Sequence, residues 1–263
     1  MELEIVRADP AGNITVFVLN PPDSPEKRAE AVRAIMADPG LHAEQVGFVL
    51  PPEKTGGNWR LEMMGGEFCG NAGRSFALLA AAEAGLSGRH TLTVEVSGLA
   101  APAAVNIDTE ARTAEIEIKP PLEDEAVVMG RRFPVYLFEG ITHVIAENAG
   151  QDEKLTRLIM RETEKQNPCE ALGIMYYDSA KRFMRPVVWV KAADTLVYES
   201  SCGSGTAALG AWITRNITDA ETEVEIKQPG GAITARVARQ AGQIRRLSIS
   251  GEVTLGRAFR YRF

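Results

Sequence analysis

The chain has 263 residues, of which 45% are hydrophobic and 24% are charged, and its formal net charge is −6. This composition is close to that of average folded domains, which argues against disorder, collagen and coiled coil, and the negative charge gives no general attraction for nucleic acid or anionic lipid. No apolar run approaches the roughly 20 residues that span a bilayer, and residues 1–5 do not resemble a signal peptide. Together with three cysteines, these features predict a soluble protein of the cytoplasm, with no nucleic-acid or membrane partner.

The first half of the chain predicts short strands and two helices in alternation. The strand segments are apolar and rich in β-branched residues, and they cover residues 2–6, 14–19, 46–50, 59–64, 92–96 and 113–118. Ser24 and Pro25 are typical of the start of a helix, and Pro39 follows its end. An Ala/Leu-rich segment over residues 75–84 is apolar on nearly every side, so it predicts a buried central helix that Gly85 ends.

The second half repeats the order of the first. Five landmarks recur 126 to 133 residues later: residues 12–16 as 140–144, the helix at 24 as an amphipathic stretch over 152–165, 44–48 as 170–174, 69–71 as 202–204, and 94–96 as 224–226. Because such an ordered series is hard to obtain by chance, the chain is predicted to be a tandem pair of similar α/β units. The predicted domains are residues 1–120 and 121–253, and the strand at 254–263 is a candidate to return to the first domain.

Each half places a cysteine directly before a small-residue turn that opens its buried helix. The two turns are Cys69-Gly70-Asn71-Ala72 and Cys202-Gly203-Ser204-Gly205. A helix N-terminus favours the thiolate form of a cysteine, and its N–H groups can bind a carboxylate or a phosphate. A lone free cysteine is usually a small buried hydrophobe, which is the prediction for Cys169. The recurrence of the same turn at the same place in both halves favours a functional role for the other two.

These two turns resemble the catalytic signatures of the diaminopimelate epimerase-like superfamily of cofactor-independent racemases and epimerases. The resemblance extends along the chain: Gly12-Asn13 is similar to the family's N-terminal Gly-Asn pair, Glu44-Gln45 to its Asp-Gln pair, and residues 141–144 fall where the epimerases carry Asn-Pro-His-Ala-Val. It implies a mixed α/β (α+β) fold of two pseudo-symmetric domains, each a β-barrel-like sheet around one central helix.

The resemblance also implies an isomerase that uses two cysteines as an acid/base pair. One thiolate would remove the α-proton of an amino acid, and the other thiol would deliver a proton to the opposite face. Cys69 and Cys202 would be this pair, with His143 supporting Cys69 and Glu199 supporting Cys202. The residues implied in substrate binding are Asn13, Gln45, Gly70, Asn71, Ala72, Gly203, Ser204 and Gly205. No cofactor and no metal are expected; the expected partners are a small amino-acid substrate and, as the candidate assembly, a second copy in a homodimer.

The segments that would read the distal end of diaminopimelate differ from those of the epimerases. The spacer before Cys202 is shorter and places Ser200 where the epimerases carry an arginine. A site without its bidentate carboxylate reader disfavours a substrate that depends on it. Within the superfamily, the shortened second motif and the run Gly-Gly-Glu-Phe-Cys-Gly-Asn look most like the histidine racemases of metallophore pathways. Glu62 or Glu67 could then meet an imidazole.

Three alternatives stay open on the sequence. Two share the fold: a diaminopimelate epimerase, and an isomerase or dehydratase of a small carboxylic acid such as a hydroxyproline. Both cysteines are intact, which favours reversible proton transfer, because a dehydratase commonly replaces one of them with Ser or Thr. The third alternative is a redox or metal-binding dithiol protein. The Cys-x-x-Cys pattern is absent, however, and a structural zinc would need four ligands.

Overall fold

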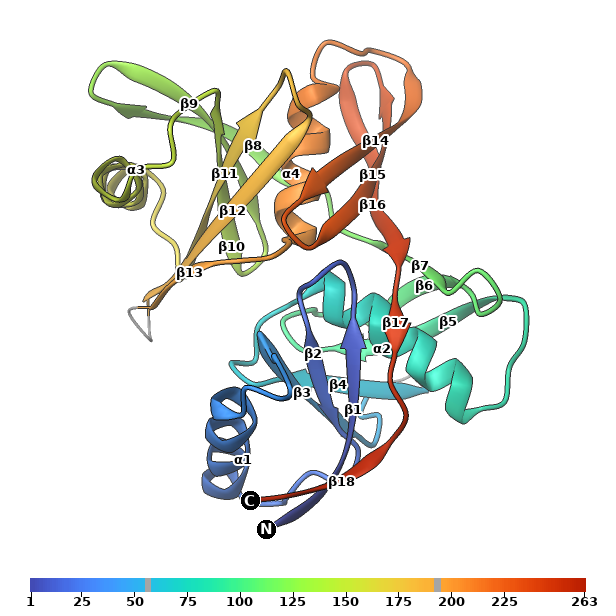
Figure 1. The fold of residues 1–263 in the computed structure, drawn as a ribbon. Helices are drawn as coiled ribbons and strands as arrows, with labels where there is room; N and C mark the ends of the chain where they lie inside the picture. The colour runs from blue at the N-terminus through green and yellow to red at the C-terminus, as the bar shows by residue number, and fades with distance from the viewer. Residues whose placement is uncertain (55–57, 192–194) are drawn as a thin grey trace. The chain divides into compact units, whose positions relative to one another are not determined.

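The computed structural model describes residues 1–54, 58–191 and 195–263, which form two compact units (Figure 1). Unit 1 consists of Met1–Glu117 and Ser250–Phe263, and unit 2 consists of Ile118–Ile249. The predicted boundaries after residues 120 and 253 stay predictions; contacts within the structure divide the chain after residues 117 and 249. The C-terminal segment belongs to unit 1, and it returns there as a pair of short strands.

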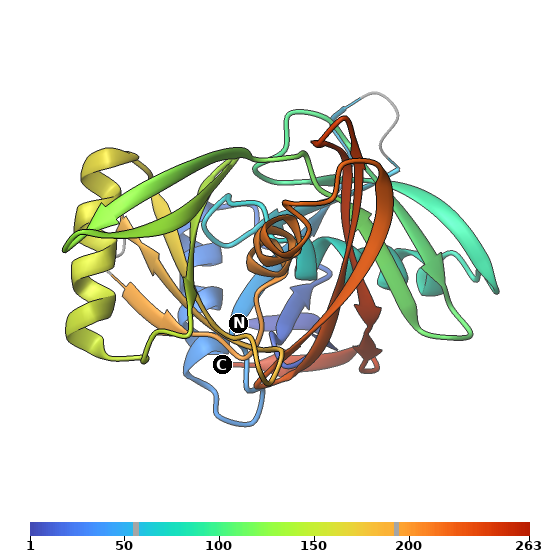
Figure 2. The ribbon, with the colours of Figure 1, turned by 90° about the horizontal axis from the view of Figure 1, so that it is seen from above.

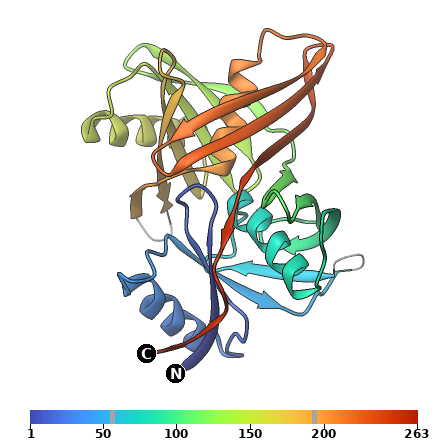
Figure 3. The same ribbon diagram turned by 45° about the vertical axis from the view of Figure 1, so that its right-hand side comes forward.

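Unit 1 contains the helices α1 (Pro25–Ala37) and α2 (Gly70–Glu83). Its strands are β1 (Glu2–Asp9), β2 (Thr15–Val18), β3 (Gln45–Leu50), β4 (Trp59–Met63), β5 (Arg89–Val96), β6 (Ala103–Asp108), β7 (Thr113–Glu117), β17 (Thr254–Leu255) and β18 (Phe259–Arg262). The pairs β2–β3 and β4–β5 are parallel, whereas β1 pairs antiparallel with β2 and with β18, which runs beside it in Figure 3. Helix α2 packs against β4, β5, β6 and β7, and it is buried over most of its length because its side chains are mainly small and apolar.

Unit 2 contains the helices α3 (Glu153–Gln166) and α4 (Gly203–Ile213). Its strands are β8 (Leu122–Val128), β9 (Arg131–Phe138), β10 (Ile141–Glu147), β11 (Ala171–Asp178), β12 (Phe183–Val190), β13 (Thr195–Tyr198), β14 (Ala220–Gln228), β15 (Gly231–Gln240) and β16 (Gln243–Glu252), the last of which continues into unit 1. Strands β10 and β11 are parallel, in the place that β2 and β3 hold in unit 1. Helix α4, seen nearly end-on in Figure 2, contacts β10, β11, β14 and β15 and is the buried central helix of this unit.

The predicted mixed α/β fold is confirmed, with one buried central helix in each unit. The sheets are not closed into barrels within the described ranges, although β1 also pairs with β17 and β18, the last strands of unit 1. Strands β6, β8 and β9 are among those that have no counterpart in the sequence prediction. Helix α2 also begins earlier than predicted, at Gly70. None of the helices in the described part of the chain is long and apolar enough to cross a membrane.

Candidate active site

Cys69 is the N-cap residue of α2. Its backbone is extended (φ −125°, ψ 112°), and its sulfur accepts a hydrogen bond from the N–H of Ala72 at 3.4 Å. A helix leaves its first N–H groups without intrahelical partners, so here the thiol takes the place of the usual Ser or Asp cap. Placing sulfur at the positive end of the helix stabilises a negative charge on it. The Ala72 N–H therefore donates to the thiol in this structure, and its role in substrate binding stays a prediction.

The side chain of Asn13 connects Cys69 to the parallel strands of unit 1. Its Oδ1 accepts hydrogen bonds from Gln45 Nε2 (2.9 Å) and Asn71 Nδ2 (3.2 Å), and it lies 4.0 Å from Cys69 Sγ. Gln45 also donates to Thr15 Oγ1, directly opposite it across the β2–β3 pair. Three of the predicted substrate-binding residues thus converge on the first thiol, and all three are buried.

Cys202 caps α4 in the same way. Its backbone dihedrals are −130° and 116°, and its sulfur accepts from the N–H of Gly205 at 3.4 Å. Ser204 Oγ lies 3.7 Å from Cys202 Sγ and 2.8 Å from His143 Nε2. The residue two positions after each cysteine is therefore bonded to a polar side chain from another element: Asn71 to Asn13, and Ser204 to His143.

Strand register explains why the supporting side chains of the two units differ. In unit 1, Thr15 is opposite Gln45, whereas in unit 2, His143 is opposite Gly173. A Cβ at Gly173 would overlap the imidazole of His143. The absence of a side chain at Gly173 thus leaves room for the imidazole of His143.

The thiol of Cys202 is held in its protonated form. Burial raises its pKa well above the usual value, and the negative charge of Glu199 raises it further, whereas the hydrogen bond from Gly205 opposes both effects. The carboxylate of Glu199 therefore acts on Cys202 and favours its protonated form, which can donate a proton.

Replacing Glu199 by Gln is expected to lower the pKa of Cys202, because it removes the neighbouring negative charge while keeping a side chain of the same size. Alkylation of Cys202 by a small reagent near neutral pH should become about tenfold faster, because a larger fraction of the thiol is ionised. Peptide mass spectrometry can follow this rate. The exposed Glu153→Gln, on α3, is the control, and equal rates in both variants would contradict an electrostatic role for Glu199.

His143 is completely buried, and burial lowers its pKa to about 3, which the backbone of Gly173 only partly opposes. The imidazole is therefore neutral at physiological pH. A neutral ring with its proton on Nδ1 accepts a hydrogen bond at Nε2 from the Ser204 hydroxyl, which leaves the serine oxygen to accept a hydrogen bond from the Cys202 thiol. The structure thus links His143 to the turn of Cys202. Its assignment to Cys69 stays a prediction.

The free energy of unfolding should depend on pH through His143. In the unfolded chain, His143 takes up a proton as the pH falls below about 6.5, whereas in the folded chain it does so only near pH 3. The stabilisation that arises from this difference is therefore complete above pH 6.5 and is lost as the pH falls toward 3. Between about pH 7 and about pH 5 the loss should be about 2 kcal/mol. Urea unfolding of His143→Gln should lack this slope, and His90→Gln, at a more accessible histidine, should retain it. An equal slope in both variants would refute the neutral, buried state.

The structure gathers the twelve predicted site residues into two groups, one in each unit. Unit 1 holds Asn13, Gln45, Cys69, Gly70, Asn71 and Ala72, and unit 2 holds His143, Glu199, Cys202, Gly203, Ser204 and Gly205. Two supporting residues were not predicted. Gln228 on β14 accepts from the N–H of Cys202 (2.8 Å) and donates to Thr206 (2.9 Å), and Arg74 on α2 donates to Asn71 (3.2 Å). No spacing in the sequence marks Gln228, whereas Arg74 stands five residues after Cys69 within the predicted motif.

The two glutamates considered as imidazole partners lie apart from these networks. The carboxylate of Glu62 pairs with Arg28 (3.0 Å) and with Arg60 (2.9 Å). Glu67 is exposed. The negative charge of Glu62 is thus already neutralised by two arginines, so its carboxylate is poorly suited to bind the imidazole of a substrate as well.

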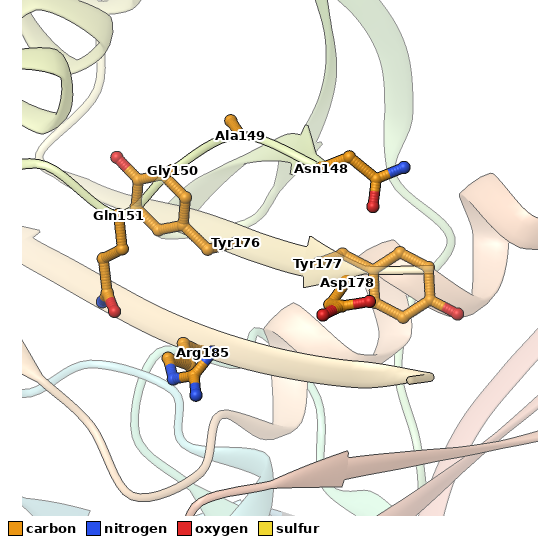
Figure 4. A pocket seen from close by; sticks show the side chains of 8 residues that line it. All are labelled: Asn148, Ala149, Gly150, Gln151, Tyr176, Tyr177, Asp178 and Arg185. Carbon is orange, nitrogen blue, oxygen red and sulfur yellow. The ribbon is translucent and has the colours of Figure 1, made fainter. Parts of the chain in front are cut away.

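A pocket of about 370 Å³ lies in unit 2 at the carboxyl ends of the parallel strands β10 and β11 (Figure 4). It is lined by Asn148, Ala149, Gly150, Gln151, Tyr176, Tyr177, Asp178 and Arg185. Asn148 follows His143 by five residues of extended chain, about 16 Å, so the pocket is separate from the Cys202 turn. No group of three His, Cys, Asp or Glu side chains that could hold a metal occurs among the described residues.

Comparison with solved structures identifies the class to which this fold belongs. The chain superposes over its full length on a PhzF-family phenazine biosynthesis protein from Bacillus anthracis (TM-score 0.71, 15% identity, 100% of both chains). It also superposes on a hydroxyproline epimerase from Agrobacterium vitis (TM-score 0.67, 13% identity, 98% of this chain and 92% of that one). These likenesses establish the fold, which is that of PhzF proteins and proline racemases.

Sequence comparison gives the family. The chain belongs to the histidine racemase CntK N-terminal domain family, which it matches over residues 2–259. A histidine racemase from Fusobacterium nucleatum is 34% identical over 221 residues, 80% of this chain and 81% of the relative, and one from Staphylococcus aureus is 28% identical over 262 residues, 96% and 94%. The protein is an isomerase of the racemase and epimerase class. The predicted homodimer and cytoplasmic location remain predictions.

Proposed function

We propose that this protein is a histidine racemase that works without pyridoxal phosphate, using Cys69 and Cys202 as an acid/base pair. The observation that carries the proposal is the matched capping of α2 and α4: each sulfur accepts from the N–H three residues later at 3.4 Å. Two cysteines with the same capping geometry suit two steps of the same kind, the removal and the return of a proton.

In this proposal one sulfur acts as the base and the other as the acid. The thiolate takes the α-proton of the amino acid, and the thiol donates its proton to the opposite face of the carbanion, which inverts the centre. The two sulfurs exchange protonation states in each turnover, and they titrate as a coupled pair because like charges disfavour two thiolates. The raised pKa of Cys202 suits the role of donor for this residue in the resting enzyme.

The substrate carboxylate is proposed to bind the first turns of the two helices. The N–H groups of Ala72 and Gly205 bond to sulfur, which leaves this role to the turns formed by Gly70-Asn71 and Gly203-Ser204. Helix N-termini stabilise negative charge, and here they would also stabilise the charge that develops as the α-proton leaves.

Histidine is proposed as the substrate on the basis of the family and of the relatives at 34% and 28% identity. The shortened segment before Cys202, which lacks the arginine expected of a diaminopimelate epimerase, agrees with a substrate that has no second amino-acid end.

Exchange of the α-proton with D2O tests the reaction and the substrate together. The purified protein is incubated with reductant, without pyridoxal phosphate, and with a panel of L-histidine, diaminopimelate, hydroxyproline and the common L-amino acids. Deuterium incorporation with loss of chirality is expected for histidine alone. Activity confined to diaminopimelate or hydroxyproline would overturn the substrate, and absence of exchange across the panel would overturn the reaction.

A further inference from the structure

Gln228 is a buried glutamine at the end of β14, and the turn that follows it lies against the segment before Cys202. Its Oε1 accepts from the backbone N–H of Cys202 (2.8 Å), and the N–H of Gly230 donates to the carbonyl oxygen of Ser200 (2.8 Å). A buried amide is destabilising unless its polar atoms are bonded. Here both ends of the Gln228 amide are bonded, and both bonds lead to the start of α4.

Three hydrogen bonds form a closed ring that begins and ends on the backbone of Cys202. A backbone N–H can only donate, so the Gln228 atom that faces it is the amide oxygen. The amide NH2 group therefore donates to Thr206 Oγ1 (2.9 Å), and the hydroxyl hydrogen of Thr206 is left to bond the carbonyl oxygen of Cys202 (2.7 Å). The N–H and the C=O of Cys202 are thus both held by buried side chains.

None of these three bonds involves the sulfur, so the ring is the same whether Cys202 is a thiol or a thiolate. The two peptide groups that the ring holds fix the direction of the Cα–Cβ bond, and this direction sets the position of Sγ in a given rotamer. Proton transfer between sulfur and carbon depends steeply on that position, because a misplacement of about 1 Å costs about a hundredfold in rate. The ring is therefore suited to keep Cys202 aligned through a whole cycle of proton transfer.

Unit 1 cannot form the same ring around its own cysteine. The repeat of the capping turns places Gly73 where unit 2 has Thr206. The repeat of the strands that follow the central helices places Gly98 where unit 2 has Gln228. A Cβ at Gly98 would overlap the backbone nitrogen of Phe68, so no side chain fits there. The ring is thus a feature of the second capping turn and not of the repeat.

We propose that Gln228, together with Thr206, is a positioning residue that keeps the sulfur of Cys202 aligned on one face of the substrate. The proposal rests on the proposed function, in which each cysteine serves one face. Loss of the ring should therefore impair proton transfer by Cys202 and leave proton transfer by Cys69 intact.

The first measurement needs no activity. The chain has three cysteines, so isotope labelling of the cysteine nitrogens gives three amide signals, whose exchange with D2O is followed by NMR. In Gln228→Met, which keeps the length of the side chain, the amide of Cys202 should exchange at least about tenfold faster because its partner is lost. The amides of Cys69 and Cys169 should keep their wild-type rates. Thr206→Val should have a smaller effect of the same kind, and Thr206→Ser, which keeps the hydroxyl, should restore the rate.

Thr214→Val is the matched control for Thr206→Val. Thr214 lies at the other end of α4, is buried, and donates to the carbonyl oxygen four residues earlier (2.9 Å), as Thr206 does. The control should destabilise the fold about as much, and it should leave the exchange of the Cys202 amide unchanged.

The second measurement separates the two cysteines by the face of the substrate that each one serves. In Cys69→Ser, only Cys202 can take the α-proton of histidine, exchange it with D2O and return deuterium to the same face; in Cys202→Ser, only Cys69 can. Adding Gln228→Met should slow this one-sided exchange about a hundredfold in the Cys69→Ser background, and less than about threefold in the Cys202→Ser background. With both cysteines present, Gln228→Met should lower kcat with little change in KM.

Equal losses in the two backgrounds would show a merely structural role and overturn the proposal, as would an unchanged exchange rate of the Cys202 amide in Gln228→Met. Should Gln228→Met fail to fold, the comparison of Thr206→Val with Thr206→Ser and Thr214→Val decides in its place. A protein that exchanges the α-proton of no amino acid would overturn the proposed function, and the amide measurement would still show whether Gln228 holds Cys202.

Discussion

Replacement of either Cys69 or Cys202 by serine is expected to reduce racemisation of histidine by at least about a thousandfold, the size of a general acid/base contribution. An alcohol of nearly the same shape can still cap the helix, but it is far too weak an acid to exchange protons near neutral pH. The loss should therefore occur without a large change in stability. Chiral chromatography of the product measures the rate, and urea unfolding measures the stability.

The two variants should each retain half of the reaction. The remaining cysteine can still remove the α-proton from its own face and return deuterium to that face, so each variant should exchange one enantiomer of histidine with D2O without inverting it. Cys169→Ser is the matched control, because Cys169 is a partly buried cysteine that packs against the core beside α3 and caps no helix. Racemisation within tenfold of wild type by either Cys69→Ser or Cys202→Ser would rule out the two-base mechanism.

Replacement of Gly173 by alanine is the second change with a large expected effect. The added Cβ would overlap His143 Nδ1 and approach Met175, and His143 is buried without room to move aside. Overpacking of this kind destabilises a fold by about 2 kcal/mol. The displaced imidazole would also lose its hydrogen bond to Ser204 beside Cys202. We expect racemisation to fall about a hundredfold, in line with the loss of a positioned proton-transfer group.

Gly150→Ala is the control for this change, because a Cβ at Gly150 meets no other atom within contact distance. It should leave both activity and the free energy of unfolding unchanged. If Gly173→Ala is destabilised while racemisation per folded molecule stays at the wild-type level, His143 would serve the fold alone.

The elements that could be predicted from sequence are those whose patterns are local. Both capping turns follow from the motif itself, and α1 begins at Pro25 as Ser24 and Pro25 indicate. The β8–β9 hairpin was missed because β8 is acidic and mostly exposed, which resembles a linker. Strand β6 was missed because Asn106 and Asp108, which have low strand propensity, interrupt its apolar positions Val105 and Ile107. Helix α2 begins before the predicted start because its first turn contains Gly70, Asn71 and Gly73, which have weak helix propensity, and the cysteine cap stabilises it there.

The residues that support the thiols depend on tertiary pairing. Asn13 and Gln45 were taken from a family resemblance, yet the hydrogen bond that joins them requires the parallel β2–β3 register. The proximity of His143 to Ser204 follows from glycine at position 173 on the neighbouring strand, a relation between positions 30 residues apart that no short motif shows. Gln228 reaches Cys202 from a strand that follows α4.

The discontinuity of unit 1 has a consequence for how the protein is made. Strand β1 leaves the ribosome before unit 2, yet β17 and β18, which pair with its second edge, are translated only after the whole of unit 2. Throughout that interval the nascent chain carries an unpaired strand edge, a known template for misassembly. Chains that terminate early, before Thr254, would keep that edge open permanently and should depend on chaperones to stay out of aggregates.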